Sequence, residues 1–278
     1  MLKQRVITAI VLLALLLPAL FATNPWPFAV MTLVLIAAAG WEWSRLNDAG
    51  AAPSIGFGIV LALACAAALA MGWTHLSVSW AWWLALLLWV LGGVWVLRRG
   101  PGTWPAMPKA ARQVLGFVAL WLAWLAFANA KTIGINFLLS VLCLVWAADI
   151  AAYFGGKAFG RHKLAPTISP GKSWEGVWSG MAGVLVLGVI WILLERNLQV
   201  DSASLYARLQ ERAGVVGLVL ALVFLSAMSV VGDLVESLVK RGAGAKDSSG
   251  LLPGHGGVLD RIDALIPVVP LALALSSF

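Results

Sequence analysis

Long apolar runs, each close to the length of a membrane-spanning helix, follow one another along almost the whole chain. Roughly 20 apolar helical residues cross the hydrocarbon core of a bilayer, and a helix satisfies its own backbone hydrogen bonds there. We expect nine such helices, near residues 6–21, 27–43, 55–73, 78–97, 114–130, 133–154, 176–194, 214–235 and 264–278. The sequence therefore predicts an all-α, polytopic integral membrane protein. Only 11% of the 278 residues are charged, too few for the surface of a water-soluble domain of this size.

The first and last runs are the least regular. The first follows Lys3 and Arg5, as in a signal peptide, but it lacks a convincing small-residue cleavage site and is interpreted as a retained helix. The last, "ALIPVVPLALALSSF", is short and holds two prolines. It fits either a tilted helix or a partly re-entrant one.

Lys and Arg are divided unevenly between alternate loops. One set of loops holds 15 of the 19, namely Lys3, Arg5, Arg45, Arg98, Arg99, Lys109, Arg112, Lys157, Arg161, Lys163, Lys172, Lys240, Arg241, Lys246 and Arg261. By the positive-inside rule, the amino terminus and residues 244–263 face the cytoplasm, in a bacterial-type inner membrane. The net charge of +7 fits an anionic leaflet or anionic substrates, and nucleic acid is not an expected partner.

The two halves of the chain differ in polarity. Residues 1–131 are expected to form amino-terminal transmembrane helices that embed the protein, and residues 132–278 to form a catalytic transmembrane region with cytoplasmic loops. Glu42 stands at the end of a span, where it is expected to reach water and to be structural. Cys65 and Cys143 lie inside spans without metal-site spacing, so we expect small buried side chains and no disulfide or zinc site.

Asp149 is an ionisable residue late in a predicted helix. Helical spacing places it on one face with Trp146, Ile150 and Tyr153. Because a charge inside a membrane is costly, such a residue marks either a functional site or a pair with a neighbouring helix, and both interpretations stand.

The loop "GGKAFGRHKLAPTISPGKSWEG" follows this helix and contains Lys172 and Ser173. Its "GKS" is not a phosphate-binding P-loop, because Pro166 occupies the position of the first glycine and no strand is expected before it. The loop is either a donor-rich surface for phosphates and anionic headgroups or ordinary positive-inside charge.

A polar stripe runs along the next span and leads into a Gly-rich stretch. Its members recur at spacings of three and four, and are Ser226, Ser229, Asp233, Glu236, Ser237 and Lys240. In a membrane helix such a stripe must face protein or water. Carboxylates and cations continue to alternate as far as Asp263, which suits a triphosphate held by Mg²⁺ and by Lys and Arg donors. Glycines there let the backbone turn sharply close to a ligand.

The stretch "SLVKRGAGAKDSSGLLPGHGGVLDRID" resembles the signature of the phosphatidate cytidylyltransferase, or CDP-diacylglycerol synthase, family. Matching positions are Ser237, Lys240, Arg241, Lys246, Asp247, Pro253, His255, Gly256, Gly257, Asp260, Arg261 and Asp263. The upstream loop is also similar to the family's other cytoplasmic loop, so the resemblance covers roughly residues 146–263. It implies that CTP and phosphatidic acid react to give CDP-diacylglycerol and pyrophosphate. The resemblance also implies Mg²⁺ as the cofactor and leaves open whether K⁺ binds as well.

The resemblance assigns roles to individual residues. Asp233, Asp260 and Asp263 are the expected metal ligands, and the expected catalytic residues are Asp233, Lys240, Asp247, Asp260 and Asp263. Expected substrate-binding residues are Ser237, Arg241, Lys246, His255, Gly256, Gly257, Arg261, Lys172, Ser173 and Asp149.

Several alternatives remain open. Arg261 could instead pair with Asp260 or Asp263, and Asp247 with Lys246. A related CTP-dependent transferase would act on another lipid phosphate or lipid alcohol, and an ion-coupled transporter would use Asp149 and Asp233 as a relay. The sequence also leaves a homodimer open.

Overall fold

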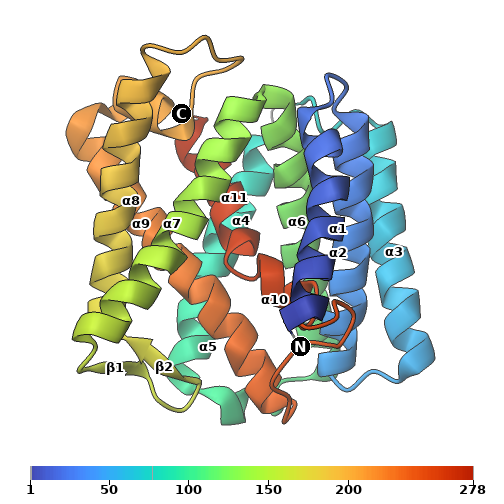
Figure 1. The fold of residues 1–278 in the computed structure, drawn as a ribbon. Coiled ribbons are helices and arrows are strands. Elements are labelled where there is room, and N and C mark those ends of the chain that lie inside the picture. Colours follow the sequence, from blue (N-terminus) through green and yellow to red (C-terminus); the bar gives the residue numbers. More distant parts are fainter. Residues whose placement is uncertain (1, 77, 278) are drawn as a thin grey trace.

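Seven long apolar helices lie side by side in the computed structural model, which describes residues 2–76 and 78–277 (Figure 1). They are α2 (Trp26–Leu46), α3 (Ala51–Ala70), the continuous segment Ser79–Arg99, α6 (Lys109–Ile133), α7 (Ile135–Phe159), α8 (Trp174–Glu195) and α9 (Leu205–Gly242). The segment Ser79–Arg99 is built from α4 (Ser79–Leu87), a π-helical turn (Leu88–Gly93) and α5 (Val94–Arg99). The predicted α-helical, polytopic class is therefore confirmed.

The predicted number of nine spans is not confirmed. Among the described residues, seven helices are long and apolar enough to cross a membrane. The first run forms α1 (Leu2–Phe21), whose apolar part Val6–Phe21 is shorter. The last forms α11 (Leu265–Ser276), with only 12 residues. Phe278 and the side chains of Lys3 and Arg5 lie outside the described residues.

Helix α11 occupies the middle of the bundle (Figure 1). It packs against α4, α6, α7 and α9, and nearly all of its side chains are buried. At about 1.5 Å per residue it is too short to cross a bilayer. The last apolar run is hydrophobic all round because protein surrounds it.

Helix α9 is interrupted at Gly214, where φ is +66° and ψ is −173°. Only glycine adopts this conformation readily, so the chain changes direction there. The break coincides with the expected start of the eighth span, and the preceding turns from Leu205 onward form a separate helical segment.

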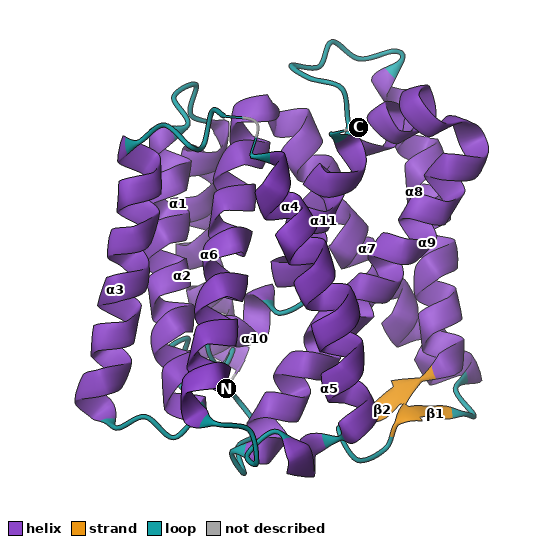
Figure 2. Cartoon of the chain, turned by 180° about the vertical axis from the view of Figure 1, so that it is seen from behind, coloured by secondary structure: helices purple, strands orange, loops and turns teal. Residues whose placement is uncertain are grey.

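A short β hairpin connects α7 to α8. Strands β1 (Lys163–Ala165) and β2 (Ser169–Ser173) are antiparallel, so the expectation of no strand here was wrong. Figure 2 shows the hairpin at the same end of the bundle as the amino terminus. Ser173 ends β2 and caps α8, because its hydroxyl accepts from Gly176 N at 3.2 Å. The cap fixes the position of Lys172 relative to α8.

The other end of the bundle positions α7. The Asp201 carboxylate accepts from the backbone N–H groups of Ile135 at 2.5 Å and Asn136 at 2.9 Å. Partial burial raises the pKa of Asp201, but these two N–H groups outweigh it and lower the pKa below its usual value. An ionised Asp201 thus satisfies backbone donors at the start of the helix that carries Asp149.

Candidate active site

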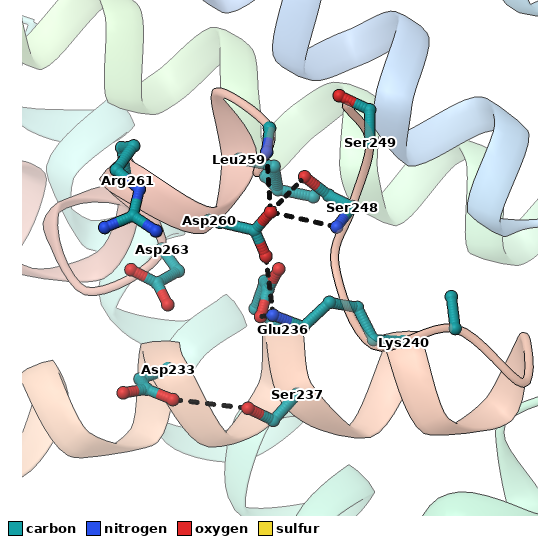
Figure 3. Close-up of polar contacts among 12 residues, drawn as sticks. Asp233, Glu236, Ser237, Lys240, Ser248, Ser249, Leu259, Asp260, Arg261 and Asp263 are labelled. Carbon is teal, nitrogen blue, oxygen red and sulfur yellow. Dashed lines mark hydrogen bonds and ion pairs between the residues drawn. The ribbon is translucent and has the colours of Figure 1, made fainter. Parts of the chain in front are cut away.

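The Gly-rich stretch connects α9 to α10 (Leu259–Ile262) at the end of the bundle where the amino terminus lies (Figure 1). Residues of α9, the loop and α10 meet in one polar cluster (Figure 3). The polar stripe of α9 faces protein as predicted, since Ser226 and Ser229 are 1% exposed and Glu236 is 4% exposed.

Asp260 is the most heavily hydrogen-bonded carboxylate of the cluster. Its Oδ1 accepts from Lys240 Nζ at 2.6 Å. Its Oδ2 accepts from Ser248 N and Ser248 Oγ, both at 2.9 Å, and from Gly257 N at 2.8 Å. Burial raises the pKa of Asp260, but the ammonium group of Lys240 and the Gly257 N–H outweigh burial and hold the pKa well below its usual value. Asp260 is therefore ionised at neutral pH.

Lys240 bridges two carboxylates. Its Nζ lies 2.6 Å from Asp260 Oδ1 and 2.6 Å from Glu236 Oε2, one turn earlier on α9. The other oxygen of Glu236, Oε1, is buried without a hydrogen-bond partner among the described residues. Glu236 was not predicted as a site residue, although its place on the polar stripe was the signal that could have found it.

Asp233 and Asp263 form the second part of the cluster. Asp233 Oδ2 lies 2.5 Å from Lys172 Nζ, and Asp233 Oδ1 accepts from Ser237 Oγ at 3.3 Å. Asp263 Oδ1 accepts from Ala264 N at 2.8 Å. Burial first, and then the nearby Asp233 carboxylate, raise the pKa of Asp263. Two carboxylates that repel in this way form a favourable setting for a cation.

The two glycines of the signature leave room for this network. Gly256 has φ of +85°, a conformation that other residues rarely adopt, and a Cβ there would lie 2.7 Å from Asp260 Oδ2. A Cβ at Gly257 would overlap Ser248 Oγ and Glu42 Oε1. Both positions thus require glycine for a steric reason.

A cavity of about 420 Å³ lies beside the cluster, between α7, β2, α8 and α9. Its lining combines small residues and Tyr153 with six charged or hydroxyl side chains, those of Asp149, Lys157, Lys172, Ser173, Ser226 and Asp233. The structure therefore brings the predicted residues of α7 and of the upstream loop next to the stripe of α9. Asp149 lines this cavity and forms no ion pair within the described residues.

Other predicted site residues have different partners. Arg261 donates from Nε and Nη2 to the backbone oxygen of His255, at 3.0 and 2.6 Å. Arg241 donates to the backbone oxygens of Ile168 and Ala245. In the part of the chain that the structure describes, Arg261 forms no ion pair with Asp260 or Asp263.

Lys246 and Asp247 are exposed on the loop surface. Within residues 2–76 and 78–277 they form no ion pair with each other, so that alternative is not observed. They lie next to Ser248 in the chain, at the edge of the cluster.

Glu42 differs from its prediction. It is 0% exposed and does not reach water. Four donors of the signature stretch lie within hydrogen-bonding distance of its carboxylate, namely Ser248 Oγ, which is shared with Asp260, Ser249 Oγ, Val258 N and Leu259 N. An acidic residue at the end of an apolar span was the only sequence signal.

The chain resembles known proteins over almost its whole length. The profile of the cytidylyltransferase family matches residues 3–278. The chain is 40% identical to a phosphatidate cytidylyltransferase of Haemophilus influenzae, over 97% of this chain and 96% of that protein. It is also 40% identical to a phosphatidate cytidylyltransferase of Pseudomonas aeruginosa, over 99% of this chain and 97% of that protein. The similarity therefore includes the amino-terminal helices as well as the signature stretch.

Proposed function

This chain belongs to the cytidylyltransferase family, and we propose that it transfers the cytidylyl group of CTP to phosphatidic acid, giving CDP-diacylglycerol and pyrophosphate. It is a nucleotidyltransferase and a membrane protein. The observation that carries the proposed substrates is its 40% identity, over nearly full length, to two phosphatidate cytidylyltransferases. The ion-coupled transporter loses its support, since family membership accounts for the same acidic residues.

The reaction requires that the negative charges of both phosphates be neutralised and that the two substrates be aligned. An oxygen of the phosphatidic acid phosphate attacks the α-phosphorus of CTP, a new P–O bond forms, and the bond to the β-phosphate breaks to release pyrophosphate. A phosphate monoester has a second pKa of about 6, so the attacking oxygen is already largely ionised and needs no strong general base. The difficulty is that two anions must approach each other in line. Lys172 and Lys240 place ammonium groups where they can offset that repulsion.

The carboxylates of the cluster suit a hard divalent cation. Asp233 and Asp263 would hold Mg²⁺, and it would remove the repulsion that raises the pKa of Asp263. Asp260, whose Oδ1 accepts from Lys240 Nζ at 2.6 Å, would be a further ligand. Among the described residues no three His, Cys, Asp or Glu side chains are already gathered as a metal site. A bound Mg²⁺ supplies charge neutralisation on the CTP phosphates and on the leaving pyrophosphate. A K⁺ ion nearby stays a prediction.

The cavity beside Asp233 is a suitable place for the lipid phosphate. Lys172 and Ser173 offer donors there, and Asp149 lies at the wall of the cavity. The outer surfaces of α7 and α8 next to it expose large apolar side chains, among them Ile150, Tyr153 and Trp178. Phosphatidic acid would thus reach the cavity sideways from the lipid, while CTP arrives from water. We propose that the site lies at the cytoplasmic face of an inner membrane, as the distribution of Lys and Arg between the loops predicts.

The test is pyrophosphate release by the purified protein in mixed micelles. With CTP, phosphatidic acid and Mg²⁺ all present we expect turnover, and omission of any one should abolish it. Turnover with another lipid phosphate or a lipid alcohol, but not with phosphatidic acid, would favour the related transferase instead. Cross-linking in the same micelles tests the homodimer, which stays a prediction.

Replacing Lys172 by Ala should lower kcat/KM by about 10²-fold, with most of the loss in KM for phosphatidic acid. The change removes a cavity donor and leaves the Asp233 carboxylate without its ammonium partner at 2.5 Å. Steady-state rates at varied lipid mole fraction measure the effect.

The matched control is Lys163→Ala, an exposed lysine on the partner strand of the same hairpin. It should change kcat/KM by less than about threefold, as expected for a surface side chain outside the cavity. Equal losses in the two variants would mean that general positive charge, not the cavity, is responsible.

A further inference from the structure

Glu42 connects the amino-terminal half of the chain to the candidate active site. It lies near the end of α2, more than 200 residues before its partners, and its side chain is 0% exposed. Burying a carboxylate is costly unless donors surround it. A Glu that served only to end a span would stay in water, so a buried one needs another explanation.

The four donors to Glu42 come from both sides of the loop. Ser249 Oγ at 2.5 Å and Val258 N at 3.0 Å donate to Oε1. Ser248 Oγ at 3.1 Å and Leu259 N at 2.7 Å approach Oε2. The residues before the turn and those after it are thus tied to one carboxylate. This arrangement fixes the distance between residues 248–249 and residues 258–259, the two ends of the loop.

The same loop residues hold Asp260. Ser248 Oγ lies between the two carboxylates, 3.1 Å from Glu42 Oε2 and 2.9 Å from Asp260 Oδ2. Its single hydrogen can be donated to only one of them at a time. Gly257 N, next to Val258, donates to Asp260 at 2.8 Å. A displacement at Glu42 would therefore reach Asp260 through Ser248 and through the 257–259 backbone.

Two further contacts from the amino-terminal helices reach the loop. Arg45 Nη2, one turn after Glu42 on α2, donates to the backbone oxygen of Ser248 at 2.7 Å. Thr8 of α1 donates to the backbone oxygen of Pro253 at 3.0 Å. The helices α1 and α2 thus hold the loop at three places, with Glu42 in the buried centre.

We propose that Glu42 is a positioning residue for cytidylyl transfer, which aims Asp260 by tying residues 248–249 to residues 258–259. The amino-terminal half thereby takes part in assembling the active site. This inference rests on the proposed function for its kinetic readout, and its structural readout is independent of substrates.

The test is Glu42→Gln. This variant keeps the shape of the side chain but replaces one carboxylate oxygen by an NH₂ group, which faces the hydrogen-bond donors of the loop. We expect kcat to fall by about 10²-fold while both KM values stay within about threefold, because Glu42 positions a group without touching either substrate. Hydrogen exchange should rise at least about tenfold in peptides covering residues 246–259 and stay unchanged in α9, which precedes them. Glu211→Gln, at an exposed glutamate, is the matched control and should change neither readout.

Ser249→Ala provides a second variant in case Glu42→Gln does not fold. It removes one donor from Glu42 and should show the same two effects, smaller in size. In the double variant the loss in kcat should be less than the product of the single losses, because both act through one contact.

Unchanged exchange in the 246–259 peptides would overturn the proposal, and so would faster exchange across the whole protein, which indicates general destabilisation. A kcat near that of the natural chain would also overturn it. If the natural chain itself did not turn over CTP with phosphatidic acid, the proposed function would fail. The exchange comparison would still decide whether Glu42 holds the loop.

Discussion

Replacing Asp260 by Asn should abolish pyrophosphate release, with kcat lower by about 10³-fold or more. The natural carboxylate accepts from Lys240, from Ser248 twice and from Gly257. An amide NH₂ at either oxygen position would face an ammonium group or backbone N–H donors, and the anionic ligand for a metal ion would be lost. Single-turnover and steady-state pyrophosphate assays measure the change.

Asp48→Asn is the control for this variant. The Asp48 side chain is 68% exposed and pairs with the buried Arg112 at 3.0 Å, at the same end of the bundle. Its kcat should stay within about threefold of that of the natural chain, as for a typical surface substitution. If Asp260→Asn retained more than a tenth of the activity in a folded protein, Asp260 would not be a required metal ligand.

Gly257→Ala should lower kcat by about 10²-fold or more, because a Cβ at this position overlaps Ser248 Oγ and Glu42 Oε1. The loop would have to move away from α2 and would carry Asp260 with it. Gly250→Ala is a matched substitution in the same loop, where a Cβ meets nothing within 4 Å.

The two glycine variants separate steric crowding from loop flexibility. Gly250→Ala should keep its activity within about threefold, since the new methyl group points into open space. Similar losses in both variants would indicate that the loop needs flexibility throughout. Hydrogen exchange of the 246–259 peptides provides a readout that does not depend on substrates.

The transmembrane helices were largely predictable from the sequence because apolar run length is a strong signal. Residues 27–43 and 176–194, for example, fall within α2 and α8. The apolar run that forms α11 could not be assigned from the sequence as a span or as a buried helix, since a helix buried in protein and one in lipid have the same apolar composition. The β1–β2 hairpin was missed because its five-residue strand, "SPGKS", lacks β-branched residues.

The part of the site that lies within one continuous segment of the chain was predictable. The stripe from Ser226 to Lys240 follows from helical spacing, and the structure joins it to Asp260. Contacts between distant segments could not be predicted. Neither the Lys172–Asp233 pair nor the Glu42 contacts have a local sequence signal, because tertiary packing creates them.

The Glu42 contacts also bear on how the protein is made. Glu42 leaves the ribosome 206 residues ahead of Ser248, so α2 is inserted while its carboxylate has none of its four donors. Domains of a growing chain generally fold as they emerge, but this acidic side chain must wait for the last helices. Its desolvation is compensated only when the signature loop arrives. Shortened translation products that stop before the loop would therefore keep an acid at the membrane surface without the partners that it has in the finished enzyme.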